Sequence, residues 1–424
     1  MNLIFYLLYI PIVFDCIYVI PGVNLQRALQ FFVLFLILLI LFNHKKIKLY
    51  NSQCITYVYL LVTSLLISAL FSIEMEIAFI STAKIIFYYI LSIAVFLFMK
   101  ESWKLEFQKV EKLFPIILIP SFILSSGIIW GFITATEVTR FSGIKGESDS
   151  PSGTICVILP IAFYYLQKFG VLKKSEFKNL LVYSLIVSFI LMSALSIILT
   201  GSRMGLLILS IILLVLLIKS FRIYLKPLKV MIIGLALFLV ISFVKSNDMF
   251  EKTYDHIFSR ISSGINFLIT GNETVGRSFT DRVHKIEVGL DLFCEFPIFG
   301  TGLYSEYYIL RSLTGDGWYH NSFLEILAGG GIVSFIFYLL INIRIFQNLK
   351  ILSKFSSAGV FLMISYFALI LENIFLSITS DPLFWTLFLP ISMYIEWWRK
   401  SKLVKVRAST EIKTELTFST TNNG

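Results

Sequence analysis

Apolar segments long enough to cross a membrane recur along the whole chain, and they restrict the possible folds most strongly. A transmembrane helix needs about 20 predominantly apolar residues, and twelve segments of this sequence approach that length. They are residues 3–20, 26–42, 54–72, 77–99, 113–133, 152–167, 180–199, 204–219, 228–244, 322–342, 359–378 and 384–398. Pro11 and Asp15 interrupt the first of them. The pattern predicts an all-α polytopic membrane protein with about twelve transmembrane helices.

The composition excludes a soluble globular protein. Hydrophobic residues account for 57% of the 424 residues and charged residues for only 15%, against about 25% charged residues in soluble domains. We expect nine helices within residues 1–244, a long polar loop over residues 245–321, and three more helices within residues 322–398. Residues 399–424 are mostly polar and lack a packing period, which is typical of a disordered tail.

Lysine and arginine residues concentrate in alternate connections between the apolar segments. With the N-terminus inside, the cytoplasmic connections and the C-terminal tail carry most of these residues, and the short outer loops carry few. Because cytoplasmic loops are enriched in Lys and Arg, we expect both termini in the cytoplasm and residues 245–321 outside. The net charge of +10 then indicates contact with anionic lipid, and we expect no nucleic acid partner.

The long polar loop contains two predicted helices. Apolar residues recur at helical spacing over residues 249–268, which indicates an amphipathic helix on the outer membrane surface. A second helix is predicted over residues 282–296, where Thr280 or Asp281 can cap its start and Pro297 ends it. The loop thus brings structured elements to the outer side of the membrane.

One face of the second helix gathers unusual residues. Arg282, Lys285 and Gly289 share this face because residues three, four and seven apart lie on one side of a helix. The glycine-rich run that follows, residues 299–308, is expected to form a turn. It lacks the Lys-Ser/Thr pair of a phosphate-binding loop.

Several arginines are candidates for binding an anion outside the membrane. Arg203 follows a Thr-Gly-Ser turn between two apolar segments; it either anchors the chain at the interface or binds phosphate oxygens bidentately. Arg282 is either a solvated helix residue or, because a cation is unfavourable near a helix N-terminus, part of an anion site. Arg277 can take the same role, and Arg140 lies in another outer loop, residues 139–153.

His320 stands where the chain returns to the membrane. It follows the interfacial aromatics Trp318 and Tyr319 and precedes Asn321. Such a histidine is either a polar anchor or a general base. A neutral imidazole here could accept a proton from an attacking hydroxyl group, a contribution of about 10²–10⁴ in rate.

Four charged residues lie within the apolar segments, where charge is costly and therefore indicates function or ion pairing. They are Asp15, Lys84, Glu325 and Glu372. The run of three glycines at residues 329–331 indicates close helix packing or a kink. The four cysteines form no CxxC or Cys/His pattern, so the sequence predicts neither a disulfide framework nor a zinc site.

Four stretches of the sequence, taken in order, resemble the O-antigen ligase and O-antigen polymerase superfamily. They are the Arg-Phe-x-Gly loop at residues 139–154, the Arg turn at 199–217, the Arg–helix–Pro–Gly-x-Gly run at 281–307, and the His-Asn return at 319–340. The resemblance implies an all-helical fold of the GT-C type with a periplasmic cavity, in the inner membrane of a bacterium.

The resemblance also implies an activity. The family joins a glycan held on undecaprenyl diphosphate to an acceptor, without nucleotide sugar, metal or other cofactor. The implied partners are the undecaprenyl-diphosphate-linked glycan donor, the glycan acceptor and membrane lipid, with a chain-length regulator as a further candidate. A glycosyltransferase that uses a lipid-diphosphate-linked donor is therefore expected.

The resemblance assigns roles to individual residues. Arg203 and Arg282 would hold the donor diphosphate, and His320 would activate the acceptor hydroxyl. Arg140, Arg277 and Asn321 are the further substrate-binding candidates. The family's tryptophan after the helix arginine is not matched, because Lys285 occupies that position.

Three activities remain open from the sequence. The short outer segment before His320 and the run HNSFLEIL favour a polymerase of repeat units, such as those of O-antigen or capsule. A ligase that transfers the finished glycan to lipid A core is the alternative within the family. The charges inside the apolar segments favour a transporter or flippase of lipid-linked sugars, although no internal repeat supports it.

Overall fold

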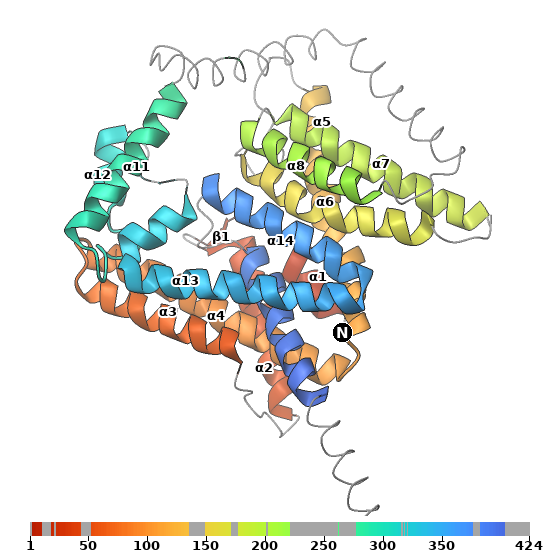
Figure 1. Cartoon of the computed structure of the whole chain (residues 1–424), viewed down its shortest axis with the longest axis horizontal. Coiled ribbons are helices and arrows are strands. Elements are labelled where there is room, and N and C mark those ends of the chain that lie inside the picture. The colour runs from red at the N-terminus through yellow and green to blue at the C-terminus, as the bar shows by residue number, and fades with distance from the viewer. Residues whose placement is uncertain are drawn as a thin grey trace, which may run out of the picture.

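The protein is a bundle of helices with one small hairpin in the computed structural model (Figure 1). The structure describes residues 2–10, 18–20, 23–43, 52–134, 149–170, 177–200, 202–220, 262, 277–314, 317, 319, 321–375 and 382–402. The predicted helices over residues 228–244 and 249–268 therefore lie almost entirely outside the described residues.

The described elements follow the apolar segments closely. They are α1 (Asn2–Tyr9), β1 (Tyr18–Ile20), β2 (Val23–Asn24), α2 (Leu25–Asn43), α3 (Gln53–Leu70), α4 (Met75–Trp103), η2 (Phe107–Leu113), α5 (Phe114–Thr134), α6 (Asp149–Gly170), α7 (Phe177–Leu199), α8 (Arg203–Ser220), α11 (Arg277–Glu295), α12 (Tyr307–Thr314), α13 (Ser322–Phe355), α14 (Ser357–Phe375) and the π-helical turn η5 (Phe384–Phe388). The last turn belongs to a C-terminal helix over residues 382–402.

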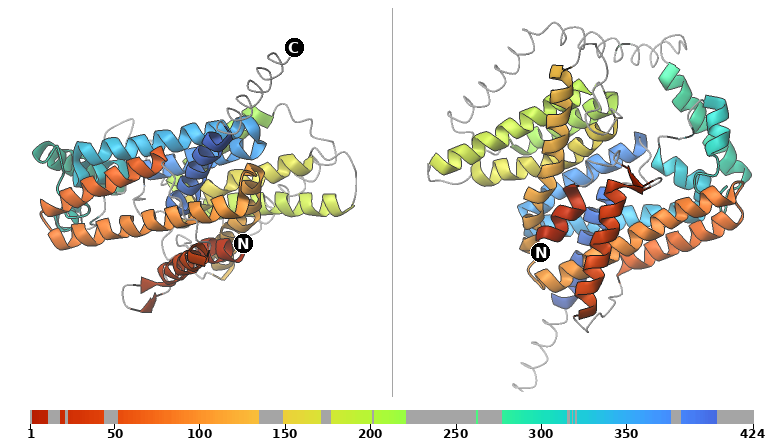
Figure 2. Two further views of the ribbon diagram at one scale, coloured as in Figure 1. Left: turned by 90° about the horizontal axis from the view of Figure 1, so that it is seen from below. Right: turned by 180° about the vertical axis from the view of Figure 1, so that it is seen from behind.

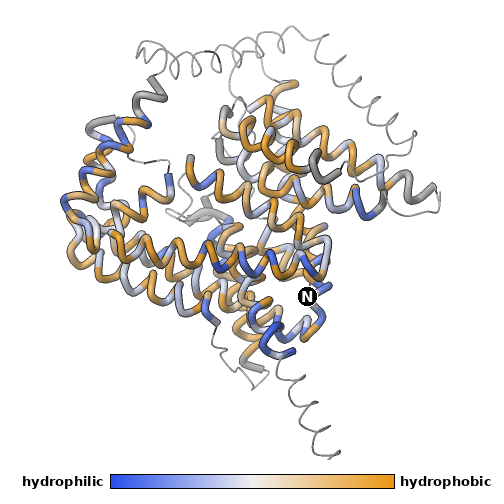
Figure 3. Tube along the Cα trace, viewed as in Figure 1, coloured by the Kyte–Doolittle hydropathy of each residue, from blue (hydrophilic) through white to orange (hydrophobic). Residues whose placement is uncertain are grey.

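Six helical segments among the described residues are long and apolar enough to cross a membrane. They are Gln53–Leu70, Met75–Trp103, Gln108–Thr134, Val182–Leu199, Ser322–Phe355 and Ser357–Ile374. Figure 3 shows that hydrophobic residues dominate these helices, whereas α11 carries many hydrophilic ones. The all-α membrane class is therefore confirmed, and the number of twelve spans stays a prediction.

The first predicted span is wrong in its second half. A helix covers only Asn2–Tyr9 at its start, and Tyr18–Ile20 forms a strand paired antiparallel with Val23–Asn24. Val19 and Ile20 are β-branched and favour extended backbone, and the Pro-Gly dipeptide that follows them is a strong turn signal. These local preferences outweigh the high hydrophobicity that suggested one continuous helix.

Two groups of helices meet along α14. In Figure 1, α3, α4 and α13 lie side by side in one group, and α5, α6, α7 and α8 form the other. Helix α14 packs on α13 in the first group and on α6 in the second. Figure 2 shows α1, the hairpin and α2 on one face of the bundle, with α2 against α4. Helix α14 therefore links both groups along most of its length.

Helix α13 is broken at Gly331. This residue has φ 67° and ψ −175°, so the helix stops there and a second helix continues in a different direction. The first part of α13 is sharply inclined to the long part in Figure 1. Because only glycine adopts such backbone angles readily, the predicted kink in the glycine run is confirmed.

The loop after α11 satisfies the backbone groups that this break frees. The amides of Thr301 and Gly302 donate to the carbonyls of Ala328 and Gly329, at 3.0 and 2.8 Å. Non-helical backbone is tolerated at membrane depth only where such partners exist. The loop is thus part of the helix break rather than a free surface turn.

A hydrogen bond in the opposite direction, from α13 to the loop, also joins these two segments. The amide of Ile332, the first residue after the break, donates to the carbonyl of Pro297 at 2.9 Å. Gly300 and Gly302 in the loop have φ of 70° and 93°. A Cβ atom at Gly300 would lie 2.5 Å from the Ala328 carbonyl oxygen. The predicted glycine turn is therefore confirmed, and its glycines allow close approach to α13.

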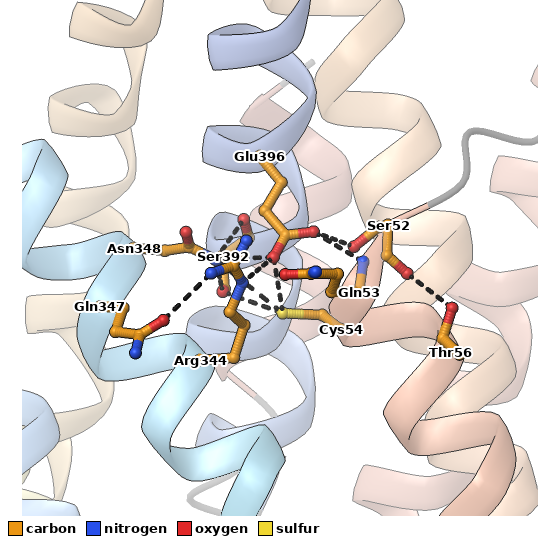
Figure 4. Close-up of polar contacts among 9 residues, drawn as sticks. All are labelled: Ser52, Gln53, Cys54, Thr56, Arg344, Gln347, Asn348, Ser392 and Glu396. Atoms are coloured by element: carbon orange, nitrogen blue, oxygen red, sulfur yellow. Dashed lines mark hydrogen bonds and ion pairs between the residues drawn. The ribbon is translucent and has the colours of Figure 1, made fainter.

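A buried polar network fastens the C-terminal helix at the other end of α13 (Figure 4). The Glu396 carboxylate accepts from Arg344 Nε at 2.5 Å and from Ser52 Oγ at 2.6 Å. Asn348 Nδ2 donates to the same carboxylate at 3.2 Å. Buried charges are stable only when they are paired and hydrogen-bonded, so this network fixes α3, α13 and residues 382–402 together.

Candidate functional site

The start of α13 is held by its own cap. The Asn321 side-chain oxygen accepts from the amides of Phe323 and Leu324, both at 3.0 Å. This is the usual arrangement of an asparagine N-cap. Capping fixes the orientation of Asn321 and uses its Oδ1 atom.

The end of α14 lies beside this start. Ser322 Oγ donates to Asn373 Oδ1 at 3.5 Å. The preceding residue, Glu372, is buried, and its carboxylate lies against Gly153 near the start of α6. A Cβ atom at Gly153 would lie only 1.6 Å from Glu372 Oε1. The absence of a side chain at residue 153 therefore makes room for a carboxylate between α6 and α14.

The start of α8 packs against the same part of α6. A Cβ atom at Gly205 would lie 2.8 Å from Ser152 Cβ, and Cys156 Sγ donates to the Gly205 carbonyl at 3.4 Å. Ser202 caps α8 by accepting from the Gly205 amide at 3.2 Å. Arg203 is the first residue of α8, so its backbone lies in this contact region.

Helix α11 covers the first part of α13. Lys285 has only 3% of its surface exposed, and Gly289 and Leu292 are also buried on the same face. A Cβ atom at Gly289 would lie 2.8 Å from Leu324 and 2.9 Å from Tyr319. The predicted face of α11 is thus confirmed as the side that packs on α13.

The predicted boundary of α11 is wrong. The helix begins at Arg277 and not after Thr280 or Asp281. Arg282 is consequently within the second turn, where it is half-buried. Helical hydrogen bonding continues back across the Ser-Phe-Thr-Asp sequence, so the capping potential of Thr280 and Asp281 is not used at the start of the helix.

The elements that carry the predicted site residues are linked through α6 and α14, since α8 packs on both of these helices, α14 packs on α13, and α13 packs on α11. Arg203 begins α8, Arg282 lies on α11, and Tyr319 and Asn321 flank the position of His320 at the start of α13. His320 and Arg140 themselves lie outside the described residues. For Arg203 and Arg277 the structure places the helix backbone. We call this region, where α6, α8 and α13 begin and α14 ends, the candidate site.

The electrostatics of the candidate site favour an anion. Helices α6, α8 and α13 all begin there, and each helix N-terminus carries about half a positive charge. Ser202 and Asn321 satisfy some of the amides at two of these starts. The arginine of α8 is placed at such a start. The helix starts therefore favour an anion at this end of the bundle.

A buried acidic residue next to this region was not predicted from the sequence. Glu306 has 1% of its surface exposed and accepts from Thr301 Oγ1 at 3.5 Å. Glu325, at 0% exposure, accepts from Tyr304 Oη at 3.3 Å. Burial, and to a lesser extent the charge of Glu325, raises the pKa of Glu306 to about 8. Glu306 is therefore protonated at neutral pH, and no spacing in the sequence indicates this.

Replacing Glu306 by glutamine is expected to stabilise the protein at alkaline pH. The unfolded carboxyl ionises near pH 4.5 and the folded one near pH 8, so folding stability falls as pH rises across this interval. By pH 8 the loss is on the order of 4 kcal/mol. The unfolding temperature of Glu306→Gln should thus be higher than that of the native protein at pH 8 and equal to it near pH 4.

The exposed Glu295, at the end of α11, offers a control for this change. Glu295→Gln removes the same charge from a solvated position, so its unfolding temperature should follow the native protein at every pH. Equal pH dependence for Glu306→Gln and the native protein would contradict a protonated Glu306.

Metal ligands do not gather in the part of the chain that the structure describes. There, no group of three or more His, Cys, Asp or Glu side chains could hold a metal ion. Cys54, Cys156 and Cys294 are free thiols.

A comparison with known protein families matches the part of the chain that contains several of these helices. A family model described as O-antigen ligase matches residues 187–339, which include α8, α11 and the first part of α13. No curated protein is significantly similar to the chain. The matched residues contain two of the four stretches that resemble this family, 199–217 and 281–307, and all of 319–340 except its last residue. Residues 187–339 are therefore similar to the O-antigen ligase family, which supports the resemblance to the O-antigen ligase and O-antigen polymerase superfamily.

Proposed function

We propose that the protein polymerises oligosaccharide repeat units carried on undecaprenyl diphosphate, at the periplasmic face of the bacterial inner membrane. The similarity of residues 187–339 to the O-antigen ligase family supports transfer of a lipid-linked glycan to an acceptor. The polymerase is favoured over the ligase by the short segment between α11 and α13 and by the sequence around His320.

The packing of α11 on α13, together with that of α8 on α6 and α14, is the observation that carries the proposal. Through α6 and α14, the start of α8 is linked to the start of α13, which supports a shared site for Arg203, Arg282 and His320. These residues are far apart in the sequence. A site that must hold a diphosphate and deprotonate a hydroxyl group needs both cations and a base in one place.

The proposed reaction is a single displacement at the donor sugar. The acceptor hydroxyl oxygen forms a bond to the anomeric carbon, and the bond from this carbon to the diphosphate oxygen breaks. The electron pair leaves with the diphosphate, and His320 accepts the hydroxyl proton. Arg203 and Arg282 stabilise the charge that develops on the departing diphosphate.

Two arginines can supply the charge stabilisation that a metal ion gives to nucleotide-sugar enzymes. Each hydrogen bond to a charged partner contributes about 1.5–3 kcal/mol. We therefore expect polymerisation to proceed unchanged in excess EDTA, measured as the length distribution of glycans formed by purified protein. A loss of activity that added Mg²⁺ restores would contradict this mechanism.

A product assay separates the proposed activity from its alternatives. Purified protein in detergent, given lipid-linked repeat units alone, should produce lipid-linked chains of two or more units. A ligase would form no product until lipid A core is added, and a transporter would form none in either case. In cells, a deletion strain of a polymerase should show core capped by single repeat units on a polysaccharide gel, whereas deletion of a ligase should strand long chains on the carrier lipid.

A further inference from the structure

A lysine lies exposed within a membrane-spanning helix. Lys84 is in α4, about 13 Å along the helix from Met75 at 1.5 Å per residue. A cation at such a depth is costly unless it faces other polar groups. Lys84 forms no ion pair with any residue that the structure describes. Lys84 is therefore a candidate for binding an anion.

A second cation stands beside Lys84 on the neighbouring helix. Phe31 of α2 and Phe87 of α4 are in ring contact, with centroids 4.2 Å apart. Arg27 and Lys84 each lie about one turn toward the helix starts from this contact. Their positive charges are close enough to repel each other. The packing of α2 on α4 thus holds two like charges together within the membrane domain.

Unsatisfied amide groups accompany these cations. Gln30, one turn from Arg27 on α2, is 0% exposed, and neither its Nε2 nor its Oε1 atom has a hydrogen-bond partner among the described residues. Gln26 is buried on the same side of the helix. The next buried positions of this face, Val33 and Ile37, are apolar. Polar side chains are therefore confined to the level of the two cations.

This polar patch is at the same end of the bundle as the candidate site. Tyr88, one turn after Lys84, stacks on Trp385 near the start of the C-terminal helix. That helix follows α14, whose last turns carry Glu372 and Asn373 in the candidate site. The turn between α3 and α4 also contacts the loop after α11, because the Ile73 amide donates to the Thr301 carbonyl at 3.1 Å.

We propose that Arg27 and Lys84 bind the diphosphate of a second lipid carrier, the one that holds the acceptor glycan. Two adjacent cations with amide groups beside them match a group of two or more negative charges better than a single carboxylate. Both cations lie on apolar helices, so we expect the phosphate to arrive on a lipid. The inference rests on the proposed function, since a polymerase takes both donor and acceptor on the same kind of carrier.

Counting bound carrier lipids tests this proposal on the full-length protein. Native mass spectrometry of the protein in phosphatidylcholine nanodiscs, titrated with undecaprenyl diphosphate, should show two molecules per chain. In Lys84→Met the second molecule should bind about 10- to 100-fold more weakly, as expected for one lost charge-assisted contact. Lys84→Arg keeps the charge and should bind the second molecule as the native protein does. Lys100→Met makes the same change at the other end of α4 and should bind like the native protein.

Other phosphates distinguish the possible sources. Inorganic pyrophosphate should not displace the second lipid, and phosphatidylglycerol should compete only weakly. Equal competition by phosphatidylglycerol would show a general site for anionic lipid and overturn the assignment to a substrate. Unchanged binding of both molecules by Lys84→Met would overturn the site itself.

Chain extension measured on the same samples separates this proposal from the proposed function. If Lys84→Met extends chains at the native rate and binds two carriers, only the acceptor site fails. If the native protein binds two carriers but extends no chains, polymerisation fails, and the assignment of the second carrier to an acceptor fails with it.

Discussion

Arg203→Ala, Arg282→Ala and His320→Ala should each slow chain extension by at least about 100-fold while the protein still folds and inserts. Removing one donor that stabilises developing charge costs about 10²–10³ in rate, and removing a general base costs about 10²–10⁴. The measurement is the initial rate of chain extension by each purified variant, with its unfolding temperature recorded alongside.

Two further variants sharpen this test. Arg203→Lys should remain well below native activity, because a point charge lacks the bidentate geometry of a guanidinium group. Arg311→Ala is the matched control, since Arg311 is exposed in α12 and contacts the Tyr307 ring. It should extend chains at the native rate. Native activity in any of the three alanine variants would remove that residue from the mechanism.

Gly331→Ala should destabilise the protein by on the order of 3 kcal/mol or more, because it strains the backbone and forces the helix break apart. Gly331 has φ 67°, and a Cβ atom there would lie 2.3 Å from the Ile298 carbonyl oxygen and 2.7 Å from the Gly300 amide nitrogen. Both contacts are with backbone, which cannot rotate away. The unfolding temperature in detergent is the direct measurement.

The effect of Gly331→Ala should extend to the loop after α11. Since Thr301 and Gly302 depend on the broken helix for their amide partners, Gly331→Ala should expose residues 296–306 to limited proteolysis. Ile332→Ala changes the next residue, whose side chain is exposed, and should alter the unfolding temperature little. A Gly331→Ala protein as stable as Ile332→Ala would contradict the backbone conformation described above.

The positions of the helices could be predicted well because each follows from a long local pattern. Residues 54–72 and 77–99 were expected to span the membrane, and helices cover Gln53–Leu70 and Met75–Trp103. Errors arose at ends and in short segments. Tyr18–Ile20 is a strand and α11 begins at Arg277, because hairpin pairing and helical hydrogen bonding compete there with weak local signals.

The candidate site was predictable only in part. The arginines and the histidine could be selected because charge is rare and costly beside apolar segments. The shared face of Lys285 and Gly289 followed from helical spacing, and its burial against α13 agrees. Glu306 could not be selected, because a glutamate in a polar loop gives no sign of burial until that loop docks.

The sequence by itself determined that this is a helical membrane protein and which cations and histidine are available for an anionic lipid-borne substrate. These conclusions rest on hydrophobicity and charge, which act over a few consecutive residues. Only the tertiary structure decided that the loop after α11 supplies the partners of the broken α13, and that Arg27 lies beside Lys84. Such contacts depend on backbone conformation and packing between segments far apart in the chain, and no local pattern encodes them.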